Sequence, residues 1–224
     1  MAQDIRAALL AAALPHVAFD GWSDAAFAAA AQGAGIDRSL ARAICPRGAL
    51  DLALAYHAAG DKEMLARLAA ADLAGLRFRD RIAAAVRLRL DGADREVVRR
   101  GTALFALPQH AALGAKAIWG TADAIWTALG DRSDDINYYS KRAILAGVYA
   151  STLLYWLGDA SPGQAATWEF LDRRIANVMQ FEKLKAAANA NPLVKAFMAG
   201  PGSVLARIRA PGARVQDHLP GSVQ

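Results

Sequence analysis

Residues 21–57 read GWSDAAFAAAAQGAGIDRSLARAICPRGALDLALAYH, and this stretch decides the fold. Ser23 suits the start of a helix, because a serine side chain accepts a hydrogen bond from a backbone N–H group of the first turn. Gly33-Ala34-Gly35 predicts a tight turn, and Asp37 predicts the cap of a short helix that ends at Ile44. A longer helix is expected to follow. Two short helices joined by a glycine turn are typical of a helix-turn-helix module.

The composition extends the helical prediction to the whole chain. The sequence is 55% hydrophobic, it is rich in Ala, Leu and Arg, which favour helices, and no segment alternates with the period of a strand. We therefore predict an all-α fold. The expected helices span about 4–14 (ended by Pro15), 23–33, 37–44, 49–59 (ended by Gly60), 61–71, 76–90, 94–106, 109–129, 133–157 and 161–184.

Three regions are expected along the chain. Residues 1–48 form the helix-turn-helix-like module, 49–190 a larger helical domain, and 191–224 an amphipathic, basic C-terminal segment with a flexible tail. The N-terminus does not resemble a signal peptide, because Asp4 lies where such a peptide is positively charged. The single cysteine, Cys45, excludes an internal disulfide and a cysteine-based zinc site, and we expect it to be a small buried residue.

The helix-turn-helix raises the question of DNA binding. Its order of helices is that of TetR-type transcriptional regulators, in which the third helix enters the major groove. The net charge of +5 suits an acidic partner, but residues 20–47 hold three acidic residues and three arginines. Affinity for DNA comes mainly from neutralising phosphates, so we expect a module kept for packing and no DNA binding. A TetR-type regulator with a lipid effector, contacting DNA through Arg38 and Arg42, is the alternative.

Side chains for catalysis or metal binding do not occur in the required patterns. No two of the four histidines (His16, His57, His110, His218) have the spacing that places two metal ligands on one helix face. Glycine-rich phosphate loops and the GxSxG motif are absent from the sequence. We therefore predict a protein that is not an enzyme and that needs no metal or cofactor, and we interpret His57 as a partly buried, hydrogen-bonded residue of a packing helix.

The segment GDRSDDINYYSKRAILAGVYASTLLYWL, residues 130–157, carries unusual chemistry. Helical spacing places Asp135, Tyr138, Tyr139 and Arg142 on one face, which Tyr149 and Trp156 continue. Tyrosine rings beside a carboxylate and a guanidinium suit a protein partner or a lipid headgroup. The other interpretation is that Arg142 and Asp135 bridge helices while the tyrosines are half-buried, and the residues alone leave both open.

Several motifs together resemble one family. GWSDAAFAAAA, RGALDLALAYH, RIAAAVRLRL, GDRSDDINYYSKRAILAGVY, YWLGDAS and WEFLDRRIANVM occur in this order between Gly21 and Met179. They resemble the family of the ninth COQ protein, whose members are accessory lipid-binding proteins of ubiquinone (coenzyme Q) biosynthesis. The resemblance implies a TetR-like, usually dimeric fold that has lost DNA binding. It also implies binding of phospholipid and of isoprenoid quinone intermediates in an apolar cavity, and their presentation to the membrane-bound demethoxyubiquinone hydroxylase.

The resemblance assigns roles to the segment around residue 138. It implies that Asp135, Asn137, Tyr138 and Tyr139 contact the hydroxylase and that Arg142 contacts a phospholipid headgroup. Tyr138 stands where the family often has tryptophan, so an aromatic side chain is kept. For the apolar cavity we expect a lining of residues at helical spacings, which could equally be ordinary core: Leu104, Phe105, Ile118, Trp119, Ile125, Trp126, Leu153 and Trp156.

The C-terminal segment has the composition of an interfacial helix. Leu193, Phe197 and Met198 form one apolar group, and Leu205 and Ile208 form another beside basic residues. A Gly-Pro-Gly break at residues 200–202 separates the two groups. We expect contact with anionic membrane, the alternative being docking on the same chain or on a dimer mate. The expected location is cytoplasmic, peripheral at the inner face of the cell membrane.

Overall fold

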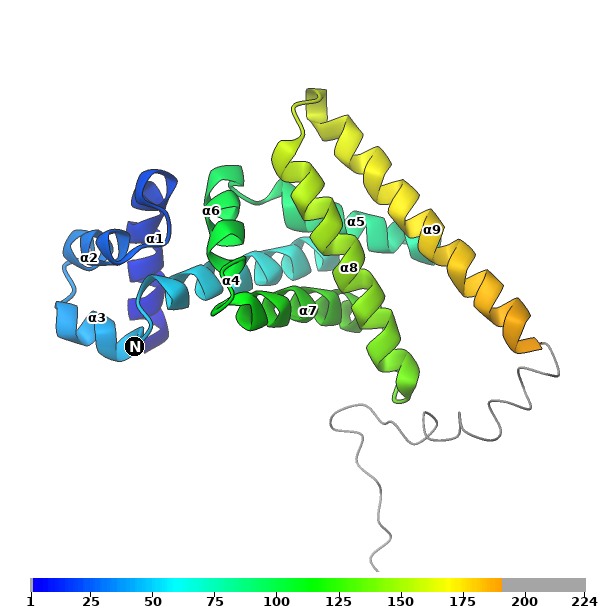
Figure 1. Cartoon of the computed structure of the whole chain (residues 1–224), viewed down its shortest axis with the longest axis horizontal. Coiled ribbons are helices and arrows are strands. Elements are labelled where there is room, and N and C mark those ends of the chain that lie inside the picture. The colour runs from blue at the N-terminus through cyan, green and yellow to red at the C-terminus, as the bar shows by residue number, and fades with distance from the viewer. Residues whose placement is uncertain (1, 191–224) are drawn as a thin grey trace, which may run out of the picture.

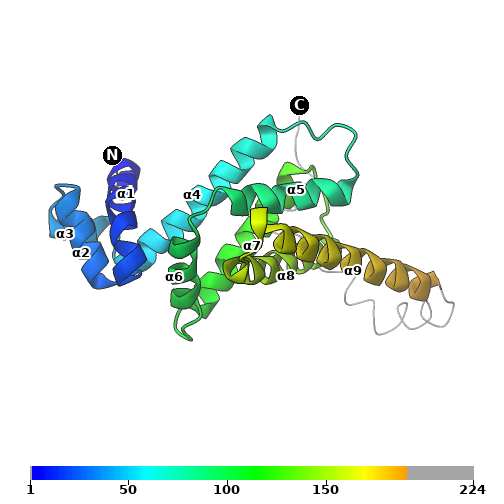
Figure 2. The same ribbon diagram turned by 90° about the horizontal axis from the view of Figure 1, so that it is seen from above.

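The computed structural model of the chain describes residues 2–190, with side chains up to residue 178, and this part contains nine α-helices and no strand. Figure 1 and Figure 2 show their arrangement. The helices are α1 (Ala2–Asp20), α2 (Asp24–Gly33), α3 (Arg38–Ile44), α4 (Ala49–Ala70), α5 (Phe78–Asp91), α6 (Arg95–Phe105), α7 (Ala111–Ala128), α8 (Ile136–Gly158) and α9 (Ala165–Ala190), with the 3-10 helix η1 (Pro162–Gln164) before α9. The all-α prediction is confirmed.

Two observations concern the predicted contact with a membrane. The expected membrane-contact residues Leu193, Phe197, Met198, Leu205 and Ile208 lie outside the described residues. Within the described part, none of the helices combines the length and the apolar character that crossing a membrane requires.

The N-terminal module follows the predicted caps. Ser23 and Asp37 each accept hydrogen bonds from backbone N–H groups in the first turns of α2 and α3, at 2.9–3.2 Å. Asp94 caps α6 in the same way, at 2.9–3.0 Å. These contacts satisfy N–H groups that have no partner within the helix. Cys45 is buried directly after α3, as predicted.

The predicted end of the first helix at Pro15 is wrong, because α1 continues through Pro15 to Asp20. A proline inside a helix removes one N–H donor and crowds the preceding turn. Leu9, Ala13 and Val17 are nevertheless all buried against the module. Their burial on both sides of Pro15 requires one continuous helix, and this packing outweighs the local cost of the proline.

The predicted break at Gly60 is also wrong, because α4 is one helix from Ala49 to Ala70. Gly60 serves close packing: a Cβ atom there would lie 2.7 Å from Nη1 of Arg89. Asp61, which lies inside this continuous helix, accepts a hydrogen bond from Nε of Arg89 at 2.7 Å. A glycine can end a helix or admit a neighbour, and only the tertiary contact distinguishes the two roles.

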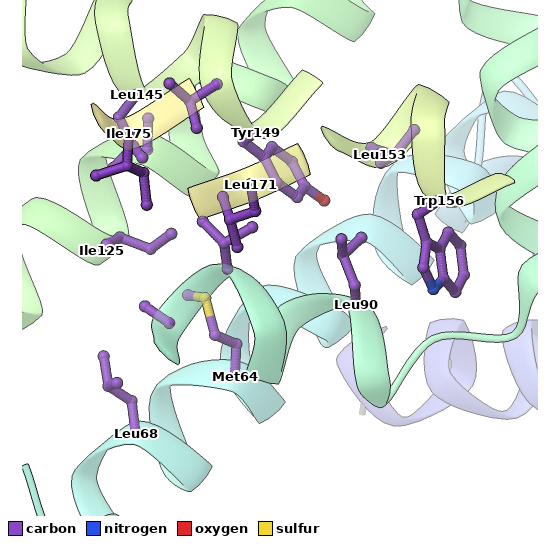
Figure 3. Packing of buried hydrophobic residues seen from close by; sticks show 14 residues of the cluster. Met64, Leu68, Leu90, Ile125, Leu145, Tyr149, Leu153, Trp156, Leu171 and Ile175 are labelled. Atoms are coloured by element: carbon purple, nitrogen blue, oxygen red, sulfur yellow. The ribbon is translucent and has the colours of Figure 1, made fainter. Parts of the chain in front are cut away.

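Helix α4 joins two apolar cores. Figure 2 shows it running from the α1–α3 unit to the larger helical body, with the chain colours marking the order. The first core is built mainly from α1–α4, around Leu9, Val17, Phe27 and Leu52, and it also includes Val97 of α6. The second core is built from α4, α5, α7, α8 and α9, and Figure 3 shows its members.

Candidate functional site

A half-enclosed apolar cavity, called the main cavity here, lies between the two cores. Its volume is about 340 Å³. Its wall is formed by residues of helices α4–α8 and by Trp22, which lies just before α2. Most of the lining side chains are apolar or small, which is typical of a site for an apolar ligand. The lining includes Trp22, Ala53, Leu90, Val97, Val98, Gly101, Phe105, Gly114, Ile118, Ala150, Leu153 and Leu154.

One of the two glycines in the wall of the main cavity, Gly114, is required by its surroundings, and the other, Gly101, has room for a Cβ atom. A Cβ atom on Gly114 of α7 would lie 2.8 Å from the Cβ atom of Phe105 at the end of α6. A Cβ atom on Gly101 would lie 3.5 Å from Nε1 of Trp22. The close approach of α6 and α7 therefore depends on Gly114, and the position of Phe105 in the wall depends on it too.

One end of the main cavity is polar. Tyr56, His57, Arg89 and Tyr149 line it, and Arg89 is only 4% exposed. Arg89 donates to Asp61 at 2.7 Å and to the backbone carbonyl of His57 at 3.1 Å. The hydroxyl of Thr121 donates to the same carboxylate at 2.9 Å. A buried cation is thus paired and hydrogen-bonded, as burial of a charge requires.

His57 is neutral at this polar end. Burial lowers its pKa below the ordinary value, and this outweighs the raising effect of Asp61. Nε2 lies 3.1 Å from the carbonyl oxygen of Ala117 and 2.9 Å from the hydroxyl oxygen of Thr121. The carbonyl can only accept, and Thr121 donates its proton to Asp61, so the ring proton lies on Nε2. The interpretation of His57 as a partly buried, hydrogen-bonded histidine is confirmed.

The predicted lining residues divide among several places. Phe105, Ile118 and Leu153 line the main cavity. Trp126 lines a second apolar cavity of about 220 Å³, together with Phe78, Ile144 and Val178. The others lie elsewhere: Leu104 in a shallow hollow beside His110, Trp119 against the ring of Tyr139, and Ile125 and Trp156 in the second core.

The sequence does not predict the polar end of the main cavity. Tyr56, Arg89 and Tyr149 are not predicted there, and His57 is predicted only as a partly buried, hydrogen-bonded residue of a packing helix. One signal was available, because His57 and Asp61 are four residues apart on one helix and therefore share a face. Arg89 and Thr121 reach them from α5 and α7, which no local pattern reveals.

A second cluster of polar side chains joins the start of α8 to α7, and we call it the α8 cluster. Arg142 is 2% exposed and pairs with Asp123 and, at 3.0 Å, with Asp131. Its guanidinium carbon lies 3.6 Å from the centre of the Tyr138 ring. A phospholipid headgroup would have to displace one of the two carboxylates to reach Arg142, so that contact stays a prediction.

Asp131 is held charged in the α8 cluster. Burial by itself raises the pKa of Asp131, but hydrogen bonds from Lys141, Ser133 and Arg142 outweigh it and lower the pKa to about 2. The distance from Nζ of Lys141 to Oδ1 of Asp131 is 2.7 Å. The loop at 130–135 is therefore fastened to α8 by charge.

The residues expected to contact a partner lie together at the start of α8. Asp135 is the N-cap, and it accepts from the backbone N–H of Asn137 at 2.9 Å and from the side-chain amide of Asn137 at 2.8 Å. The rings of Tyr138 and Tyr139 meet edge to face, with centres 5.1 Å apart. All four residues are half-buried or exposed, so the structure brings them together at the surface.

Within the described residues, no group of three or more His, Cys, Asp or Glu side chains is placed to hold a metal ion. On α3, Arg38 is exposed. Arg42 pairs with Asp24 at 2.7 Å and lies 4.9 Å from the centre of the Phe27 ring. One of the two proposed DNA-contacting arginines is therefore already bound within its own module.

The fold resembles a known class of regulators. The chain is similar to a TetR transcriptional regulator from Nitrosomonas europaea, with a TM-score of 0.62 and 20% identity over 77% of this chain and 97% of that chain. At this identity the likeness shows the fold alone, and it confirms the TetR-like architecture.

The sequence comparisons point to one family. Residues 111–182 match the COQ9 family model. The protein named "Ubiquinone biosynthesis protein COQ9, mitochondrial" from Rattus norvegicus is 31% identical over 79% of this chain and 59% of its own length. Its namesake from Drosophila melanogaster is 32% identical over 80% of this chain and 57% of its own length. The chain therefore carries a region, residues 111–182, that matches the COQ9 family model. It spans less than two thirds of the length of these curated relatives.

Proposed function

We propose that the chain is a lipid-binding accessory protein of ubiquinone biosynthesis. In this proposal it holds an isoprenoid quinone intermediate in the main cavity and presents it to the demethoxyubiquinone hydroxylase at a membrane surface. The relatives' names support the pathway. The observation that carries the lipid-binding part is the main cavity itself, about 340 Å³ with a predominantly apolar wall.

A variant that fills the main cavity tests the lipid-binding part. Ala150 of α8 lines the cavity, so Ala150→Trp places an indole where the ligand would lie. Ala143→Trp is the matched control, because Ala143 is exposed on the same helix outside the cavity lining. We expect calorimetric titration with a short-chain ubiquinone to show binding by the wild-type chain and by Ala143→Trp, and at least tenfold weaker binding by Ala150→Trp. Equal binding by all three proteins would place the lipid elsewhere.

The hydroxylase contact is proposed at the start of α8. Asp135, Asn137, Tyr138 and Tyr139 present two aromatic rings and a capped helix end, and aromatic side chains of this kind carry much of the energy of protein interfaces. Tyr139→Ala should weaken binding of the purified hydroxylase at least tenfold in surface plasmon resonance while leaving quinone binding unchanged. Ile136 is 37% exposed beside it, so Ile136→Ala reports whether this surface is used at all. Wild-type affinity in both variants would contradict the contact.

Membrane contact is proposed for the segment that holds Leu193, Phe197, Met198, Leu205 and Ile208, on its composition alone. Truncation after Asn191 should abolish flotation with anionic liposomes and leave quinone binding in detergent intact. Flotation by the truncated chain would assign the contact to another surface. The homodimer implied by the resemblance stays a prediction, which light scattering of the purified chain decides.

A further inference from the structure

The polar end of the main cavity contains a hydroxyl group that none of the described residues pairs with. Tyr149 is 0% exposed, and its hydroxyl has no hydrogen-bond partner in this part of the chain. Buried polar groups are almost always satisfied, so each exception calls for an explanation. Tyr149 lines the main cavity. In Figure 3 its hydroxyl is directed to the side where the cavity residues Leu90 and Leu153 lie, away from Ile125.

The neighbouring polar groups are already committed to one another. Arg89 donates to Asp61 and to the carbonyl of His57. Thr121 donates to Asp61, and His57 uses Nε2 toward Ala117 and Thr121. Tyr56 accepts from the backbone N–H of Asp94 at 3.1 Å. Among the described residues, Tyr149 is the side chain whose buried polar atom has no hydrogen-bond partner. Burial raises the pKa of Tyr149 to about 12, so the phenol keeps its proton at neutral pH.

The charges at this end decide which acceptor fits. The positive charge of Arg89 is balanced by Asp61 at 2.7 Å, so this end of the cavity offers no free cation for an anion. A phosphate or carboxylate would be buried without a counter-ion, which is costly. A neutral carbonyl or ether oxygen needs only one donor.

We propose that the Tyr149 hydroxyl donates a hydrogen bond to a neutral carbonyl or ether oxygen of the bound lipid, so that the lipid enters the main cavity with its oxygen-bearing end first. This inference rests on the proposed lipid-binding function and adds its orientation and its chemical selectivity. The apolar remainder of the ligand then extends past Leu153 toward Leu154, which is 58% exposed at the rim. Anionic amphiphiles are excluded from the closed end.

A pair of matched probes tests the proposal on the full chain. Geranylacetone is an isoprenoid ketone, and its hydrocarbon analogue carries a methylene group in place of the carbonyl oxygen. The two probes also differ in hydration, so the quantity to compare is the ratio of ketone affinity to analogue affinity in each protein. Because one neutral hydrogen bond in a buried site is at stake, this ketone preference should be about fivefold to tenfold larger in the wild-type chain than in Tyr149→Phe, which removes only the hydroxyl. Tyr155→Phe, on the same helix but 40% exposed and stacked on Phe170 at 4.6 Å, should keep the wild-type preference.

Each possible result of these binding measurements has a separate meaning. The same ratio of ketone to analogue affinity in the wild-type chain and in Tyr149→Phe would overturn the role of Tyr149 and leave the lipid-binding function standing. No binding of either probe by the wild-type chain would overturn the main cavity as a lipid site, and the orientation with it. Because each ratio is formed within one protein, it does not depend on how much of a variant is folded.

Discussion

At the scale of single residues, Gly60 links the fold to the polar end of the main cavity. The absent side chain leaves room for the guanidinium of Arg89, which reaches Asp61 and the backbone of His57 across α4. Breaking a buried ion pair costs more than a glycine costs a helix. The same residue therefore explains the continuity of α4 and the arrangement of charge beside the cavity.

Substituting Gly60 tests this explanation. Gly60→Ala should lower the free energy of unfolding by about 1–3 kcal/mol, because the displacement of Arg89 outweighs the helix propensity gained from alanine. Gly147→Ala is the control, since nothing lies within 4 Å of a Cβ atom there and Gly147 lies inside α8. That variant should gain about 0.5–1 kcal/mol. Urea denaturation of both variants provides the values, and a stabilised Gly60→Ala variant would show that Arg89 needs no such room.

Asp131 makes the stability of the α8 cluster depend on pH. Its pKa is lowered to about 2 in the folded chain, from an ordinary value of 3.8. The stabilisation is therefore complete above about pH 4 and is lost as the pH falls toward 2. Over this range the wild-type chain should lose about 1–2 kcal/mol that Asp131→Asn does not lose. Parallel pH–stability curves for the two proteins would mean that Lys141 and Arg142 do not hold the carboxylate charged.

At the scale of elements, the caps could be predicted and the continuity of the helices could not. The caps Ser23 and Asp37 can be predicted from the sequence, because a cap depends on contacts two or three residues away. Pro15 and Gly60 were misinterpreted because their effect depends on what packs against the helix from elsewhere in the chain. Local chemistry fixes where a helix begins, and tertiary packing decides whether it continues.

Helix α3 provides a prediction about DNA. Arg42 is held by Asp24 at 2.7 Å, and the module carries no net charge, so the phosphate-neutralising contribution to affinity is missing. Fluorescence anisotropy with a random duplex at low salt should show no binding at micromolar protein. Salt-sensitive binding that Arg38→Ala or Arg42→Ala weakens would instead support a DNA-binding regulator.

At the scale of the whole molecule, the main cavity is the feature that the sequence could least reveal. Its wall is assembled from helices α4–α8, with Trp22 from the segment before α2. Phe105, Ile118 and Leu153 were expected there, because apolar residues at helical spacing mark a buried face. The periodicity does not distinguish a face that packs against another helix from a face that lines a cavity. Ile125 and Trp156 were therefore predicted in the cavity wall but lie in the second core.

The central claim is that this cavity holds an isoprenoid lipid, and the most direct measurement is the lipid that accompanies the purified chain. The full chain and its Ala150→Trp and Ala143→Trp variants would be purified from a host that makes ubiquinone, extracted after denaturation, and analysed by quantitative mass spectrometry. If the main cavity holds the lipid, the wild type and Ala143→Trp should each carry close to one isoprenoid quinone per chain, and Ala150→Trp should be strongly depleted. A wild-type chain without lipid, or equal amounts of lipid in all three proteins, would contradict the claim.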